Sequence, residues 1–421
     1  MFEKIILKNG MRVLLVRADH IETATVLLLV GTGSKYEIKR NNGISHFLEH
    51  LLGKGTKKRP TEKEVAETID SIGGVFNFFT GKEITGFWVK LQSKFLDTAL
   101  DWISDIYLNS LFRERDIESE KGVIIEEINH YLDTPIEYVG DLFEELLYKG
   151  QPAGFPILGK KENIKRFKKE DFLKYRKEHY CAKNTLLCIA GRIKDSEIEK
   201  RVERLFKKIN TSFPKGKKKV IERQKKPNFL LLFKETDQTH LCLGVRTFPL
   251  SSPKRFAISL ISTILGGPMS SRLFIEVRAK RGLAYYIKTT SQFYTDSGYL
   301  VTQAGISHQN VEKGIRLILR EYNRMKERKI SKKELEKMKE NLKGRISISL
   351  ESSHNQASFF GEQEILLGKI LTPKEIFNEI DKVTQDDIQE ISREIFRPEK
   401  LNLALIGPFK EKEKFEKLLK I

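Results

Sequence analysis

The stretch Gly43-Ile44-Ser45-His46-Phe47-Leu48-Glu49-His50-Leu51-Leu52 combines an apolar helical pattern with three side chains that can do chemistry. His46 and His50 are four residues apart, so a helix places both imidazoles on one face, one turn from each other. Two imidazoles placed in this way can bind a single tetrahedral zinc ion. Glu49 leans towards the same face, three residues after His46. The stretch therefore predicts a largely buried helix with a metal-binding face, and it requires a third ligand from elsewhere.

A second expected helix, from about Arg115 to Leu132, offers candidates for that ligand. Glu120 and Glu127 are seven residues apart in it, which is two helical turns, so both carboxylates face the same way. Asp133-Thr134-Pro135 ends the helix, because the residue before a proline disfavours helical backbone.

Length and composition limit the class of protein. A chain of 421 residues is longer than one hydrophobic core usually supports, and its 39% hydrophobic content argues against global disorder. No run approaches the roughly 20 apolar residues that span a bilayer. The three cysteines are too few and too scattered for a disulfide framework. With no signal peptide recognised at the start, we expect a cytoplasmic protein of two domains without a membrane partner.

The net charge of +19, from 76 Lys and Arg against 57 Asp and Glu, raises the question of nucleic-acid binding. However, the basic residues are interspersed with acidic ones along most of the chain, and no aromatic-basic stacking motif occurs. We therefore expect no nucleic-acid partner and interpret the charge as a property of the surface.

The second half of the chain repeats the pattern of the first. The apolar runs 231–234 and 240–247 echo 14–17 and 25–32, and 402–408 repeats the ending of 188–191. We expect an α+β fold of two homologous domains, each a mostly antiparallel sheet flanked by helices. The expected boundaries are 1–212 and 229–421, joined by a Lys-rich linker at 213–228. The second copy has no H-x-x-E-H pattern, so any chemistry is asymmetric between the halves.

The H-x-x-E-H pattern followed by Glu127 resembles the inverted-zincin peptidases, which include pitrilysin, insulin-degrading enzyme and the mitochondrial processing peptidase. Further segments match the family in order: Gly53-Lys54-Gly55-Thr56, Gly73-Gly74 with Asn77 and Thr80, Glu120 to Ile128, and Ser271 to Tyr285. The length is similar to that of the short members, each equal to half of a pitrilysin-type enzyme.

The resemblance implies a role for each residue of the two helices. His46, His50 and Glu127 would bind one zinc per chain and leave a fourth position for water. Glu49 would be the general base that takes the water's proton, and Glu120 would orient the histidines from outside the ligand set. Two neutral imidazoles and one carboxylate leave a site of charge +1, which lowers the pKa of a bound water towards 7.

The resemblance also implies substrate contacts. Arg278 and Tyr285 match a paired Arg and Tyr that contact the substrate carbonyl, where an oxyanion needs a cation and a hydrogen-bond donor. Asn77 and Phe78 lie where the family has an edge strand that binds peptide backbone by strand addition. Phe78 departs from the small residue usual at that position, which affects pocket width.

Family geometry implies that the chain is half of a clamshell and that a partner subunit completes each site. Because this chain has both the zinc set and the Arg/Tyr pair, a homodimer with composite sites is expected. The expected function is a zinc endopeptidase that hydrolyses peptides or unfolded segments inside a chamber. The alternatives are a non-catalytic structural relative of the same fold and a subunit that processes targeting peptides.

Overall fold

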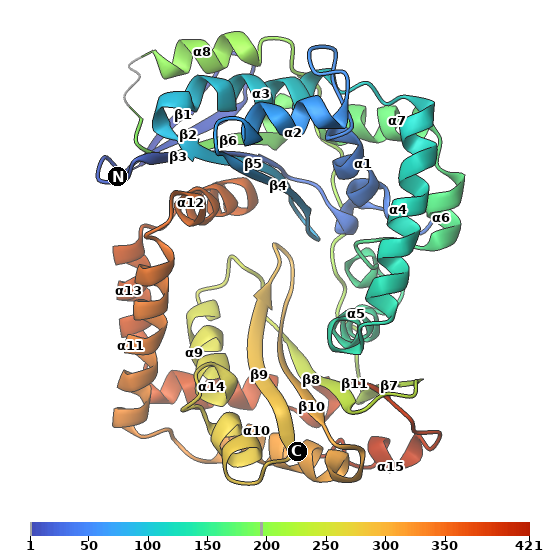
Figure 1. The fold of residues 1–421 in the computed structure, drawn as a ribbon. Coiled ribbons are helices and arrows are strands. Elements are labelled where there is room, and N and C mark those ends of the chain that lie inside the picture. The colour runs from blue at the N-terminus through green and yellow to red at the C-terminus, as the bar shows by residue number, and fades with distance from the viewer. Residues whose placement is uncertain (1, 194–196) are drawn as a thin grey trace. The chain divides into compact units, whose positions relative to one another are not determined.

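A computed structural model describes residues 2–193 and 197–421 and divides into two compact units (Figure 1). Unit 1 comprises Met1–Ile128, Phe155–Lys218 and Ile348–Ile370, and unit 2 comprises Asn129–Gly154, Lys219–Ser347 and Leu371–Ile421. The sequence suggests contiguous domains at 1–212 and 229–421 with the linker 213–228. The compact units differ from that division because each takes one segment from the other half of the sequence.

Unit 1 contains a six-stranded sheet in the order β1-β2-β6-β3-β5-β4, in which only β2 and β6 pair in parallel. The strands are β1 (Phe2–Ile6), β2 (Arg12–Arg17), β3 (Thr23–Val30), β4 (Val75–Thr80), β5 (Thr85–Gln92) and β6 (Thr185–Gly191). Residues 24–30 of β3 are all buried, because helices cover both faces of the sheet there. This explains the continuous apolar run that the sequence shows.

Unit 2 contains a five-stranded sheet in the order β7-β11-β8-β10-β9, with β7 and β11 parallel. The strands are β7 (Asn228–Phe233), β8 (Thr239–Thr247), β9 (Ala284–Phe293), β10 (Gly298–Ile306) and β11 (Leu401–Gly407). Taken in chain order, β7 to β11 occupy the same places as β2 to β6 in unit 1. The prediction of two copies of one fold, each with a mostly antiparallel sheet, is therefore confirmed.

The helices fill corresponding connections in the two halves. Those of the first half are α1 (Ile44–Leu52), α2 (Glu62–Asp70), α3 (Leu96–Asn109), α4 (Glu114–Leu132), α5 (Pro135–Leu147), α6 (Lys161–Arg166), α7 (Lys169–His179) and α8 (Ile198–Leu205). Those of the second half are α9 (Arg255–Gly266), a π-helix (Phe274–Ala279), α10 (Val311–Glu327), α11 (Lys332–Ser349), α12 (Ser353–Leu367), α13 (Pro373–Lys382), α14 (Gln385–Ile395) and α15 (Glu413–Glu416). Within residues 2–193 and 197–421, none of the helices combines the length and the apolar composition that a bilayer span requires.

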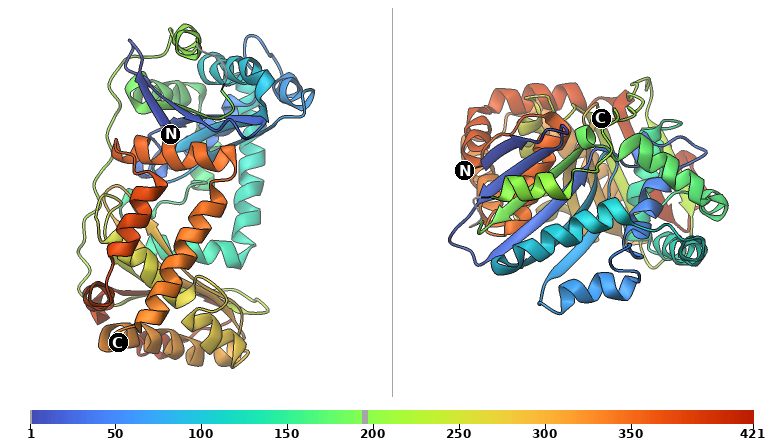
Figure 2. Two further views of the ribbon diagram at one scale, coloured as in Figure 1. Left: turned by 90° about the vertical axis from the view of Figure 1, so that its left-hand side faces the viewer. Right: turned by 90° about the horizontal axis from the view of Figure 1, so that it is seen from above.

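The two halves exchange one helix each. Helix α12 belongs to the second half of the sequence but packs on β3, β6 and β2 of unit 1, where its Ala357 and Phe360 join the apolar core. Helix α5 belongs to the first half but packs on β11, β8 and β7 of unit 2. Figure 2 shows the orange α12 against the blue strands of unit 1 from two further directions. Each sheet thus has one face covered by a helix from the opposite half.

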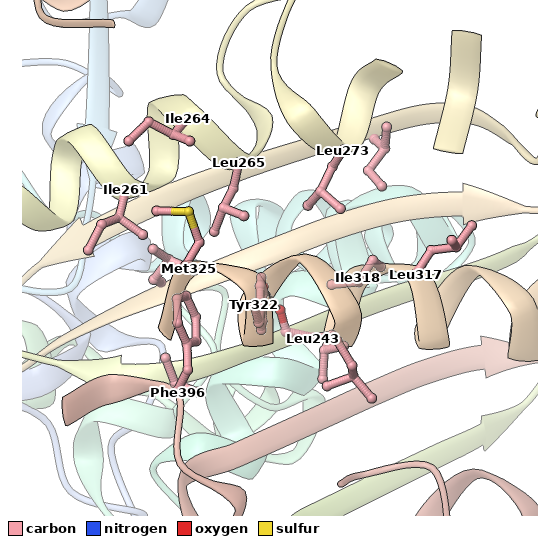
Figure 3. Packing of buried hydrophobic residues seen from close by; sticks show 14 of the residues in the cluster. Leu243, Ile261, Ile264, Leu265, Leu273, Leu317, Ile318, Tyr322, Met325 and Phe396 are labelled. Carbon is pink, nitrogen blue, oxygen red and sulfur yellow. Dashed lines mark hydrogen bonds between the residues drawn. The ribbon is translucent and has the colours of Figure 1, made fainter. Parts of the chain in front are cut away.

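The other face of the unit 2 sheet carries the main core of that unit, which is built from α9, α10, α14 and the strands (Figure 3). The fully buried Tyr322 contributes its ring to this core and stacks on Phe396 at 4.3 Å between centroids. Its hydroxyl donates to the Leu243 carbonyl oxygen at 3.0 Å, so the polar end is satisfied as well.

Candidate active site

Helix α1 starts at a position that only glycine fills easily. Gly43 has a φ of 99°, and a Cβ there would lie 2.9 Å from the Gly159 Cα and the Leu158 carbonyl oxygen. The buried Glu37 carboxylate accepts from the backbone N–H of Gly43 at 2.8 Å and of Ser45 at 2.9 Å. A carboxylate at a helix N-terminus satisfies free N–H groups and interacts favourably with the helix dipole. This arrangement fixes where the two histidines of α1 lie.

Three side chains from α1 and α4 converge on one point. His46 Nε2 and His50 Nε2 are 3.2 Å apart, and Glu127 Oε2 lies 3.6 Å from the first and 3.7 Å from the second. A circle through three atoms with sides of 3.2, 3.6 and 3.7 Å has a radius of about 2.0 Å, which matches zinc–nitrogen and zinc–oxygen bond lengths. Within the described part of the chain, these residues form the one group of three or more such side chains with ligand atoms close enough to share a metal.

The chemistry of the donors also fits a metal ion. The Glu127 Oε2 atom is buried and has no hydrogen-bond partner among the described residues. Burial, reinforced by His50, lowers the pKa of His46 to about 3, so this imidazole is neutral and has a lone pair to donate. Burial also lowers the pKa of His50, but the hydrogen bond to Glu120 and the nearby carboxylates outweigh it and raise the pKa overall. Burial raises the pKa of Glu127 as well. A proton and a metal ion would therefore compete for the same atoms.

Glu120 holds the other side of the His50 ring. Its Oε1 accepts from His50 Nδ1 at 2.8 Å, and its Oε2 accepts from Lys54 Nζ at 2.7 Å. Burial raises the pKa of Glu120, but the hydrogen bonds from His50 and Lys54 outweigh burial and leave the pKa below its ordinary value. An ionised acceptor at Nδ1 keeps the proton on that nitrogen and directs the Nε2 lone pair to the shared point.

Glu49 is buried beside the three converging atoms and is tied to the sheet. Its Oε2 accepts from Thr80 Oγ1 of β4 at 2.8 Å. Burial raises the pKa of Glu49 to about 7, against the lowering effects of His50 and of the Thr80 hydrogen bond. A carboxylate with a pKa near neutrality can both accept and return a proton at physiological pH.

Strand β4 is the edge of the unit 1 sheet, and among residues 2–193 and 197–421 its one partner is β5. Asn77 lies in this strand and is exposed, as an edge that binds a peptide requires. The Phe78 ring instead packs towards the interior, 5.3 Å from the Phe87 ring and 6.0 Å from the Trp102 ring between centroids. A Cβ on Gly53 would lie 2.9 Å from the Phe78 ring, so the ring also closes the space behind the end of α1.

Arg278 and Tyr285 lie close together along the chain in unit 2. Arg278 is exposed in the π-helix, with its guanidinium 4.9 Å from the centre of the Phe274 ring. Tyr285 is in β9, the edge strand that corresponds to β4, and its side chain is 75% exposed. Both side chains are therefore available to a ligand.

Three residues that support the site were missed by reasoning from the sequence. Glu37 precedes α1 by several residues, Lys54 follows it, and Thr80 is in β4. Glu37 binds backbone N–H groups at the start of α1, Lys54 binds Glu120 and Thr80 binds Glu49, and none of these pairs has a recognisable sequence spacing. A signal existed only for Lys54 and Thr80, which fall in segments that match the resembled family.

Comparison with known proteins decides the family. The insulinase model of peptidase family M16 matches residues 12–161, and the model described as the peptidase M16 inactive domain matches residues 166–342. The chain belongs to peptidase family M16. An uncharacterized zinc protease, YmxG of Bacillus subtilis, is 36% identical over 97% of this chain and 98% of its own length. An uncharacterized zinc protease of Rickettsia felis is 34% identical over 96% of each chain. The prediction of a short, half-length member of this family is confirmed.

Solved structures share the fold at lower identity. A protease from Helicobacter pylori aligns with a TM-score of 0.90 and 22% identity, covering 97% of this chain and 100% of that one. A peptidase M16 inactive domain from Pseudomonas fluorescens aligns with a TM-score of 0.89 and 17% identity, covering 98% of this chain and 99% of that one. A chain of complex III2 from Candida albicans aligns with a TM-score of 0.86 and 18% identity, and the alignment covers all of both chains. The same fold is thus found in proteins with different roles.

Proposed function

We propose that this M16 protein is a zinc-dependent endopeptidase that hydrolyses peptides or unfolded polypeptide segments. The observation that carries the proposal is the triangle of His46 Nε2, His50 Nε2 and Glu127 Oε2, whose size suits one zinc ion per chain. The names of the zinc protease relatives and the unpartnered buried oxygen of Glu127 support the same metal.

The chain's own residues supply positioning and proton transfer. Bound zinc would polarise the scissile carbonyl and acidify a water molecule. Glu49 accepts the proton of the attacking water on a carboxylate oxygen and then delivers it to the leaving amine, while Thr80 keeps the carboxylate in place. Glu120 keeps the Nδ1 proton on His50. The free edge of β4 binds the peptide backbone as an added strand, with Asn77 exposed along it.

We further propose that Arg278 and Tyr285 stabilise the oxyanion of a substrate bound to another copy of the chain, in a homodimer that encloses a chamber. Their exposure and their chemistry, a cation and a hydroxyl donor, support this role. The test mixes H50A and R278A proteins, each inactive alone, under conditions of subunit exchange. Partial recovery of activity is expected, and no recovery in verified mixed dimers would disprove the composite site.

The central test compares E49Q with H50A. E49Q should keep one zinc per chain and lose cleavage of a quenched peptide by about 10²–10⁴-fold, because only the base is removed. H50A should lose the zinc itself. The exposed E67Q variant serves as the matched control and should equal wild type. Wild-type cleavage by E49Q would refute the assignment of the base.

A non-catalytic role is the second candidate, since a chain of complex III2 from Candida albicans has the same fold. A subunit that processes targeting peptides is a third. The intact set of His46, Glu49, His50 and Glu127 favours a peptidase over a structural protein. Zinc binding without cleavage of any peptide in a library would favour the structural role instead.

A further inference from the structure

Lys54 lies two residues after the end of α1 and bridges two carboxylates. Its Nζ is 2.7 Å from Glu120 Oε2 and 2.9 Å from Glu62 Oε2. The two partners differ sharply in environment, because the Glu120 side chain is 3% exposed and that of Glu62 is 66% exposed. The Lys54–Glu62 contact is a surface ion pair, which water screens and which stabilises little. The contact with Glu120 supplies a counter-charge to a carboxylate that water hardly reaches.

The two oxygens of Glu120 are divided between two donors. Oε1 accepts from His50 Nδ1 at 2.8 Å, and Oε2 accepts from Lys54 Nζ. A buried carboxylate held at both oxygens has one orientation, and that orientation keeps Oε1 hydrogen-bonded to His50 Nδ1. If the ammonium were removed, Glu120 would lose one of its two donors and the cation nearest to it. The imidazole would then lose a fixed acceptor at Nδ1.

Lys54 is also fixed through its backbone. Its carbonyl oxygen accepts from Arg113 Nη2 at 2.9 Å, and its N–H donates to the Leu51 carbonyl oxygen at 3.2 Å. Arg113 directly precedes α4 and is itself bonded to Asp116 in the first turn of that helix. Lys54 therefore joins the end of α1 to α4 at two points, and these are the two helices that present His50 and Glu127.

We propose that Lys54 is a positioning residue of the metal site: by holding Glu120, it fixes the imidazole of His50 in the orientation that binds the metal. This inference rests on the proposed zinc site and deepens it. Lys54 does not touch the ligand atoms, so its effect is on metal affinity and acts through Glu120.

The test measures the zinc dissociation constant by competition with a chromophoric chelator, together with cleavage of a quenched peptide. K54M should weaken zinc binding by about 10–100-fold, the usual effect of losing an outer partner of a metal ligand. K54R should recover most of the affinity, since it restores a cationic donor. E62Q, which removes only the exposed partner, should stay within about threefold of wild type.

A double variant separates positioning from a general loss of stability. If Lys54 acts through Glu120, K54M should change zinc affinity by less than about threefold when it is added to E120Q. Thermal unfolding of the chelator-treated proteins reports any folding defect separately. Wild-type zinc affinity in K54M, or an equal loss in E62Q, would overturn the inference. So would full additivity of K54M and E120Q.

The measurements of zinc affinity and peptide cleavage also test the proposed function separately from the role of Lys54. A wild-type protein that binds zinc but cleaves no peptide refutes the peptidase, while the affinity series still decides the role of Lys54. A wild-type protein that binds no zinc refutes both.

Discussion

Replacing Glu364 by Gln should destabilise unit 1 selectively. Glu364 is in α12, and its side chain is only 2% exposed. Its Oε1 lies 2.7 Å from Lys4 Nζ in β1 and 3.2 Å from Arg12 Nη1 in β2, and these two strands pair in the unit 1 sheet. This ion cluster therefore attaches a helix from the second half of the chain to the sheet of the first half.

The size of the effect follows from the exposure of the partners. Removing one member of a fully buried pair costs about 3–5 kcal/mol. Here the side chains of Lys4 and Arg12 are 34% and 19% exposed, so water partly solvates them once the carboxylate is gone. We therefore expect a loss of about 2–4 kcal/mol for E364Q, after discounting for this screening. For a unit of about 200 residues this lowers the melting temperature by about 5–15 °C.

Tryptophan fluorescence gives an assay specific to unit 1. The chain has two tryptophans, Trp88 and Trp102, and both lie in that unit. The matched control is E3Q, because Glu3 is 58% exposed and lies 4.0 Å from Arg17, so its loss should cost less than about 0.5 kcal/mol. An E364Q protein whose fluorescence transition coincides with that of wild type would refute the idea that this cluster holds α12 on the sheet.

Three further predictions concern Glu49, the proposed base, and the close packing of unit 2. T80V removes a hydrogen bond that lowers the pKa of Glu49, so the acidic limb of the pH–activity profile should move up by about one pH unit, whereas T80S should restore it. In chelator-treated protein, burial raises the pKa of Glu49 from 4.5 to about 7. The folded state then binds this proton more tightly than the unfolded state, so stability is lost as pH rises from 5 to 8. At about 1.4 kcal/mol per pKa unit, the free energy of unfolding of E49Q, measured by urea titration, should rise by up to about 3 kcal/mol relative to wild type across that pH range. Parallel plots of unfolding free energy against pH for the two proteins would contradict the pKa shift. In the same assay, G244A should lower the free energy of unfolding by more than about 2 kcal/mol, because its Cβ would lie 2.2 Å from the Leu300 carbonyl oxygen. The control G140A in α5 should be neutral or slightly stabilising, because its Cβ meets nothing within 4 Å.

Side-chain periodicity within two helices predicted which groups share a helix face, and the family resemblance joined Glu127 to the two histidines. The four-residue spacing of His46 and His50 and the seven-residue spacing of Glu120 and Glu127 each place two groups on one helix face. The structure brings His46, His50 and Glu127 together and sets Glu120 behind His50. Local spacing works here because each pair lies within one helix, whose geometry fixes the distance.

The supporting contacts lay beyond such reasoning because they join segments that are far apart in sequence. Thr80 reaches Glu49 from a different element, and Lys54 reaches Glu120 across 66 positions. The sequence also does not decide on which face of the sheet the Phe78 side chain lies. Strand β4 has phenylalanines at 76, 78 and 79 and so lacks a clean alternation of polar and apolar residues.

The repeat of the fold was visible in the apolar strands, but the exchange of α5 and α12 was not. An amphipathic pattern shows that a helix buries one face, yet it does not say which sheet receives that face. Both sheets offer a similar row of buried aliphatic side chains, so nothing local distinguishes them. The assignment depends on the paths of α4 and α11, the long helices that precede the exchanged ones.

The exchange of α12 affects how unit 1 can fold while the chain is being synthesised on the ribosome. The strands of unit 1 are complete once residue 191 has been made, but the helix that covers their apolar face lies at 353–367. Until then Leu14, Leu27 and Leu186 lack their partners Ala357 and Phe360. A nascent or truncated N-terminal half would present this face to water, where exposed apolar surface promotes aggregation. The nascent chain therefore needs either a chaperone or rapid completion, and the N-terminal half made alone should recover its solubility when α12 is supplied as a peptide.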